Sequence, residues 1–142
     1  FRRVLFRSVD IEYHVQHLQV EYGATVKSVR LTGVREAMKA LHAADLMSES
    51  DFNSLFEAHT FLRRLINSLR ILRGHARDLV VPGTGTEEFS FLARRMGYAL
   101  GSEDKLAVDL DHHRREVIRI VDWDEKVRHF REKGGGLKQA GE

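Results

Sequence analysis

The stretch that decides the fold is residues 48–74, which read SESDFNSLFEAHTFLRRLINSLRILRG. Ser48 and Asp51 have the spacing of a capping box, in which a hydroxyl and an acid three residues later bond each other's backbone N–H groups. Small or apolar residues then recur every three or four positions: Leu55, Ala58, Leu62, Leu65, Leu69 and Leu72. These positions form the seam of a packed helix, and Gly74 is a typical end signal. The pattern predicts a helix of about 25 residues, about 37 Å long.

Outside this stretch, apolar periodicity predicts four more helices, over about residues 9–22, 32–44, 86–96 and 102–130. Thr32 is the expected N-cap of the second helix, and Gly23 and Gly97 are expected to end the first and the fourth. Strand-like alternation is scarce, and Pro82 is the only proline, so little interrupts the helices. We therefore expect an all-α protein, an antiparallel bundle of about five helices with one long connection.

The two ends of the chain differ from the rest in composition. Residues 1–8 begin without Met and mix arginine with bulky apolar side chains in no helical period, which is typical of a non-native lead-in. Residues 133–142 are rich in glycine and have too little apolar surface to order themselves, so we expect a flexible tail. The helical bundle domain is therefore predicted over residues 9–132.

Composition limits the class of protein further. A chain of 142 residues is the size of one domain, and the absence of cysteine excludes disulfides, thiolate zinc sites and cysteine nucleophiles. No apolar run reaches the ~18 residues of a membrane span. The formal net charge is only +2, so binding to nucleic acid would need a local basic patch. We expect a cytoplasmic protein with neither membrane nor nucleic acid as a partner.

Arginines gather in the second half of the long helix. Five of them, and no acidic residue, lie between Glu57 and Asp78: Arg63, Arg64, Arg70, Arg73 and Arg77. One interpretation is a solvated face whose arginines pair with acids of the last helix, such as Asp109 or Glu116. The other is an anion or partner contact formed by Arg63, Arg70, Arg73 and Arg77, because guanidinium forks match phosphate and carboxylate geometry.

Histidine and glycine patterns offer weaker signals. The chain has eight histidines, but no His-Glu-x-x-His pattern, and we expect no metal site. His113 lies near the inner stripe of the last helix, which suggests a core histidine. Residues 83–86, Gly-Thr-Gly-Thr, precede a helix but lack the Gly-Lys-Ser/Thr ending of a phosphate loop. A loop followed by an N-cap is the more conservative interpretation of this segment.

Three polar residues open the first helix, namely Asp10, Glu12 and Gln16. Acids near a helix N-terminus complement its dipole, which is the simplest explanation for them. The alternative is an interdomain or active-site edge. Residues two apart diverge by about 200° on a helix, so Asp10 and Glu12 cannot share a face, whereas Glu12 and Gln16 are aligned.

Short motifs also follow one another in a characteristic order: Asp10-Ile11-Glu12-Tyr13, Val15-Gln16, Leu18-Gln19, Phe61-Leu62-Arg63, Leu69-Arg70, Gly74, Ala76-Arg77-Asp78-Leu79, Val81-Pro82, Glu88-Phe89 and Leu92-Ala93-Arg94-Arg95-Met96-Gly97-Tyr98. Over about residues 9–130 this order resembles the helical domain of glutamine synthetase adenylyltransferases and PII-uridylyltransferase-like proteins. In that family a helical bundle follows a polymerase-β-like nucleotidyltransferase domain and packs against its active site.

The resemblance implies an accessory domain of a protein-modifying nucleotidyltransferase in nitrogen regulation. Its partners would be a catalytic domain in cis and, through the parent protein, glutamine synthetase or the PII signal protein. The parent would use ATP or UTP with Mg, whereas the bundle itself would hold no cofactor. Adenylylation, its removal and uridylylation all stay open.

Two departures from the family pattern are visible. Residues 1–8 stand where the family has a Gly-Gly lead-in, and we identify no catalytic Gly-Ser and Asp-x-Asp motif. We therefore expect no catalytic residue in this chain and no nucleotide transfer by it alone. The alternative function is a free-standing helical adaptor that binds an acidic protein or nucleic acid through its arginine stripe.

Overall fold

The computed structural model describes the backbone of residues 4–74 and 79–134, and the side chains of residues 7–74 and 79–122. These ranges contain α1 (Val4–Tyr22), the short 3-10 helix η1 (Lys27–Val29), α2 (Val34–Ala43), α3 (Glu49–Arg73), α4 (Glu87–Arg95) and α5 (Asp104–Gly134), and no strand. The predicted all-α bundle is confirmed. None of the described helices combines the length and the apolarity needed to cross a membrane.

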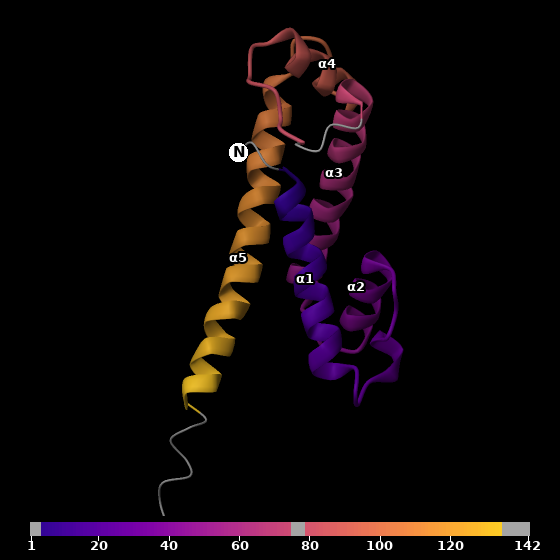
Figure 1. Cartoon of the computed structure of the whole chain (residues 1–142), viewed down its shortest axis with the longest axis vertical. Helices are drawn as coiled ribbons and strands as arrows, with labels where there is room; N and C mark the ends of the chain where they lie inside the picture. The colour runs from indigo at the N-terminus through magenta and orange to yellow at the C-terminus, as the bar shows by residue number, and fades with distance from the viewer. Residues whose placement is uncertain (1–3, 75–78, 135–142) are drawn as a thin grey trace, which may run out of the picture.

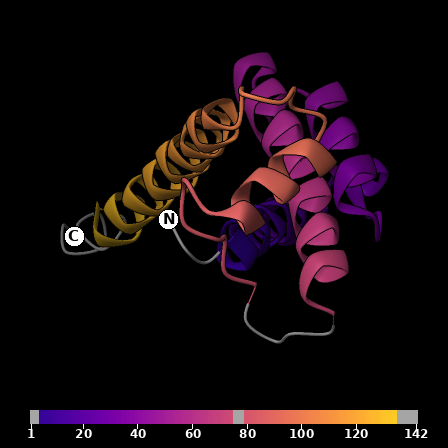
Figure 2. The same ribbon diagram turned by 90° about the horizontal axis from the view of Figure 1, so that it is seen from above.

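Helices α1, α3 and α5 form the body of the bundle (Figure 1). The chain runs in opposite directions in α1 and α3 and again in α3 and α5, and these three helices contact one another. Helix α2 packs beside α1 and α3 near one end, while α4 lies at the other end against α3. Seen from above, α5 leads away from the other helices, and its C-terminal part extends past them (Figure 2).

Helix α3 is the central element, and its predicted limits are confirmed. Its N-cap is Ser48, whose hydroxyl accepts a 3.1 Å bond from the Asp51 N–H group. Gly74 ends the helix with a φ of 68°, a conformation that glycine adopts without strain. Five seam residues are completely buried: Leu55, Ala58, Leu62, Leu65 and Leu69. Burial of this seam against α1 and α5 fixes which face of α3 points outward.

The first two helices begin at other residues than predicted. Helix α1 starts at Val4 instead of Val9, and it includes the buried Ser8 and an Arg7–Asp10 ion pair of 2.7 Å. The prediction that residues 1–8 are a non-native lead-in stays a prediction. Thr32 is not the N-cap of α2, because the chain enters that helix at Gly33, without any side-chain cap.

The connection between α1 and α2 is held against α1 by the Gln19 side chain and by a close backbone approach at Gly23. The Gln19 amide donates 2.7 Å bonds to the carbonyls of both Val29 and Leu31. Gly23 follows the end of α1 as predicted, and its Cα lies so close to the Gln19 carbonyl that a Cβ would come within 2.3 Å of the oxygen. These contacts set the place where α2 begins beside α3.

The segment before α4 is a capping loop, as predicted. The Thr86 hydroxyl accepts from the Phe89 N–H at 3.2 Å and donates to the Gly83 carbonyl at 2.6 Å. Helix α4 ends before Gly97, as expected. Helix α5 starts at Asp104 and reaches Gly134, inside the predicted tail, whereas residues 135–142 lie outside the described residues.

Candidate functional site

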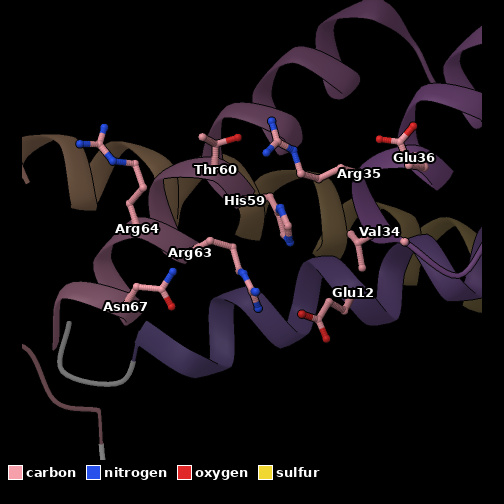
Figure 3. Close-up of a pocket in the computed structure, with 10 residues that line it drawn as sticks. Glu12, Val34, Arg35, Glu36, His59, Thr60, Arg63, Arg64 and Asn67 are labelled. Atoms are coloured by element: carbon pink, nitrogen blue, oxygen red, sulfur yellow. The ribbon is translucent and has the colours of Figure 1, made fainter. Parts of the chain in front are cut away.

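A pocket of about 460 Å³ lies between the first turn of α2, the middle of α3 and one side of α1 (Figure 3). Its lining is rich in charged and polar side chains: Glu12, Gly33, Val34, Arg35, Glu36, His59, Thr60, Arg63, Arg64 and Asn67. The residues from α3 follow helical spacing and occupy the face beside the leucine seam. Burial of Leu62 and Leu65 therefore presents Arg63 and Arg64 to the pocket.

His59 stands between the core and this pocket. Its side chain is only 6% exposed, and its Nδ1 atom has no hydrogen-bond partner within the described residues. Burial, followed by the nearby charges of Arg63 and Arg35, lowers the pKa of His59 below its ordinary 6.5. The imidazole is therefore neutral at pH 7, and Figure 3 shows it between these two arginine side chains.

The arginines of the pocket differ in their partners. Arg64 donates a 3.2 Å bond to the carbonyl of Met96 at the end of α4. The Arg35 guanidinium carbon lies 4.6 Å from the centre of the Phe56 ring, which supports the flat face of the guanidinium. Within the described part of the chain, neither Arg35 nor Arg63 forms a hydrogen bond or an ion pair, so their N–H groups are free for another partner.

A second hollow adjoins the first and shares Arg35, Thr60 and Arg64 with it. Its walls add aromatic rings, because Phe56, Phe61 and His113 line it. The rings of Phe61 and His113 lie 4.6 Å apart, and burial, together with the charge of His112, lowers the pKa of His113. His113 is half-buried. Because aromatic rings line the second hollow, the cationic pocket continues into a partly apolar one.

The polar residues at the start of α1 separate in the structure. Glu12 lines the pocket with Arg63, so two of the predicted site residues come together. Asp10 pairs with Arg7 instead, and Gln16 is exposed and does not contribute to the pocket. The alignment of Glu12 and Gln16 on one helix face therefore does not put both in one site.

The four arginines that were predicted to form one anion or partner contact do not lie together. Arg63 lines the pocket, and Arg70 is exposed without a partner in the described residues. Arg73 forms a 3.0 Å ion pair with Glu88 of α4. Arg77 lies outside the described residues.

Neither acid that was suggested as a partner for the α3 arginines takes that role. Asp109 accepts a hydrogen bond from the Tyr98 hydroxyl. Burial of Tyr98 and, after it in size, this hydrogen bond raise the pKa of Tyr98. Glu116 bonds Ser54 and Arg119, both at 2.9 Å. The predicted pairing is wrong because these acids are engaged by nearer groups.

The letters of a catalytic motif occur in the chain after all, as Gly101-Ser102 and Asp109-Leu110-Asp111. The structure gives both acids other roles, because Asp111 forms ion pairs of 2.8 Å with Arg114 and 2.7 Å with Arg115. Two residues apart on α5, the acids point in different directions. No group of three or more metal-binding side chains gathers in the part of the chain that the structure describes.

Sequence reasoning missed several residues of the pocket, above all Arg35, His59 and Asn67. Arg35 lies in the first turn of α2, where a cation is unfavourable because it opposes the helix dipole. This unfavourable placement is a feature of the sequence that could have indicated a binding role for Arg35. His59 directly follows the seam residue Ala58, and nothing in its local sequence sets it apart.

Comparison with known proteins identifies the family. The sequence model of the family described as GlnD PII-uridylyltransferase matches residues 9–123. Among curated proteins, one of Streptomyces coelicolor is 32% identical over 110 residues, covering 78% of this chain and 10% of its own length. One of Mycolicibacterium smegmatis is 37% identical over 95 residues, covering 67% of this chain and 9% of its own length.

Both relatives are named bifunctional glutamine synthetase adenylyltransferase/adenylyl-removing enzyme. The chain spans about a tenth of the length of the curated relatives it matches. No solved structure matches it significantly. Since the family match covers α2, α3 and α4 completely and most of α1 and α5, this helical bundle belongs to the GlnD PII-uridylyltransferase family.

Proposed function

We propose that this bundle is the helical accessory domain of a protein-modifying nucleotidyltransferase that acts in nitrogen regulation. The observation that carries the proposal is the match over residues 9–123, shared with relatives named for modifying glutamine synthetase, in which the matching segment is about a tenth of the protein. A segment of that proportion is a module of a longer enzyme, and it would act beside a catalytic domain in cis.

The surface of α1 suits such a contact. Tyr13 is 66% exposed and Val20 is 81% exposed, and their spacing of seven residues puts them on one face. Large apolar side chains in this register are commonly covered by another domain or protein. Gln16 is exposed between them, and we assign it to the interdomain contact, while Glu12 belongs to the pocket.

The chemistry of transfer would then belong to the catalytic domain, which would hold ATP or UTP with Mg. This bundle would contribute the pocket edge next to the nucleotide or the protein substrate. The names of the curated relatives give glutamine synthetase as their substrate. For this reason we propose glutamine synthetase, and not the PII signal protein, as the protein that the parent enzyme modifies.

The first test is to read the coding sequence on both sides of residues 9–123. An in-frame nucleotidyltransferase domain with Gly-Ser and Asp-x-Asp motifs supports the proposal. An open reading frame that contains only this bundle contradicts it and favours the adaptor function.

The second test uses the complete protein that contains the bundle. Glu12→Gln should lower nucleotide transfer severalfold without lowering the melting temperature, because the carboxylate is proposed to orient the metal-bound triphosphate or the acceptor side chain at the pocket edge, a role separate from binding an anion. Gln16→Ala should act more weakly, and Glu21→Gln, at the exposed far end of α1, is the matched control. Full activity of the Glu12 variant, or a loss that merely follows a loss of stability, would remove this residue from the site.

A further inference from the structure

We propose that the pocket between α2 and α3 binds a phosphoryl group, held by the N-terminus of α2, by Arg35 and Arg63, and by His59. The inference names a ligand class for the pocket and rests on the proposed function for its biological role. Its evidence comes from three features of the pocket that favour an anion and from a fourth, the position of the acids, that makes a separate prediction.

The first feature is the open N-terminus of α2, a helix of ten residues. The backbone bond from the Ala37 N–H to the Gly33 carbonyl, 2.8 Å long, is the first of this helix. The N–H groups of Val34, Arg35 and Glu36 precede it, no side chain caps them, and all three residues line the pocket. Unsatisfied N–H groups and the positive end of the helix dipole together attract an anion.

The second feature is the pair of unoccupied guanidinium groups. Arg35 comes from α2 and Arg63 from α3, so they approach the pocket from two elements. Stacking on Phe56 leaves the N–H edge of Arg35 free, and Arg63 has no partner among the described residues. Two such forks can bind several phosphoryl oxygens at once, with charge-assisted hydrogen bonds.

The third feature is the buried imidazole of His59. A polar atom at this depth normally has a hydrogen-bond partner, yet His59 Nδ1 has none within the described residues. The ring is more than nine-tenths buried and lies in the pocket wall between the two free arginines. With no acceptor near the enclosed Nδ1, the neutral ring carries its N–H on Nε2, and this donor suits an anionic oxygen.

The fourth feature is the position of the acids. Glu36 lies 3.6 Å from the Lys39 ammonium on the next turn, so its charge is partly balanced outside the pocket. Glu12 also lines the pocket, from the α1 side, and its charge opposes an anion there (Figure 3). Its presence predicts that removing this single carboxylate strengthens phosphate binding.

The experiment titrates the 142-residue chain with inorganic phosphate at constant ionic strength, followed by calorimetry and by the imidazole resonances of His59. We expect saturable binding that becomes about tenfold weaker in Arg35→Gln and in Arg63→Gln. Binding should become tighter in Glu12→Gln. Arg70→Gln is the matched control, because it removes the same charge from an exposed position of α3 outside the pocket.

Resonances of His59 should shift with phosphate, whereas those of His42, which lines neither hollow, should not. The inference is overturned by the absence of saturable binding, by equal losses in Arg63→Gln and Arg70→Gln, or by unchanged His59 resonances. Because these titrations need no catalytic domain, phosphate binding can be absent while the proposed function holds. Equally, phosphate binding can be found while the proposed function fails.

A parallel titration with AMP identifies the source of the phosphoryl group. The aromatic hollow adjoins the pocket, so a nucleoside attached to the phosphate would contact Phe61. Tighter binding of AMP than of phosphate, with the difference lost in Phe61→Leu, assigns the site to a nucleotide. Equal binding of the two assigns it to free phosphate, and either result supports the phosphoryl site.

Discussion

The two faces of α3 differ in how completely their side chains are engaged. On the seam, Leu62, Leu65 and Leu69 are completely buried against neighbouring helices. One position beyond Leu62 on the helix, Arg63 is exposed in the pocket, without a partner in the described residues. The contrast teaches that one regular helix can devote one face to stability and hold the adjoining face ready for a ligand.

The largest effect is expected on the seam. Leu65→Ala and Leu69→Ala should each lower the free energy of unfolding by about 2–5 kcal/mol, because each leaves a cavity in a close-packed core. Urea denaturation followed by circular dichroism measures this loss. Asn67→Ala, between them on the exposed pocket face, is the control and should change stability by less than about 0.5 kcal/mol.

A seam variant that costs less than about 1 kcal/mol would break the comparison, since such values belong to surface positions. An equal loss in Asn67→Ala would break it from the other side. It would mean that the pocket face contributes as much to the core as the seam does.

A smaller effect should come from the boundary between the two faces, where His59 lies. Its pKa is lowered by burial and then by Arg63 and Arg35, and Glu12 lines the same pocket from α1. The unfolded chain therefore binds a proton at His59 at a higher pH than the folded chain does. Stability should be fully present above about pH 7 and fall as the pH drops through the unfolded pKa of about 6.5.

Melting curves between about pH 7.5 and pH 5.5 check this trend. His113 contributes in the same direction, whereas Asp111 and Glu116, whose pKa values are lowered by arginine bonds, titrate below this range. Removing a neighbouring charge with Arg63→Gln should raise the pKa of His59, visible by NMR. An unchanged pKa in that variant would show that Arg63 does not act on the imidazole.

The contrast between the faces also separates what the sequence predicts from what it does not. The limits of α3 depend on Ser48, Gly74 and a periodic seam, all of which are local signals, and they were predicted correctly. The pocket depends on the packing of α1, α2 and α3, because Glu12 and Arg63 are distant in sequence. Only the tertiary structure brings Arg35 and His59 to the same cavity.

Errors at single residues have the same cause. Thr32 has the chemistry of an N-cap, but the bonds from Gln19 hold the preceding turn so that the helix starts after Gly33. Local propensity favours the threonine, and a contact across the connection overrides it.

The smallest effect is expected at the end of α3, where Arg73 pairs with Glu88 of α4. The two side chains are 29% and 61% exposed, so water screens the 3.0 Å ion pair. We expect Arg73→Ala to lower the free energy of unfolding by at most about 1 kcal/mol, the range of exposed pairs. A double-mutant cycle with Glu88→Gln measures the coupling without the packing of the arginine stem. A coupling free energy above about 1 kcal/mol would mean that the Arg73–Glu88 pair stabilises the fold more than exposed ion pairs do. A value near zero would show that water screens the charge of Arg73, in contrast to the charge of Arg63, which is proposed to act in the pocket through binding and not through folding.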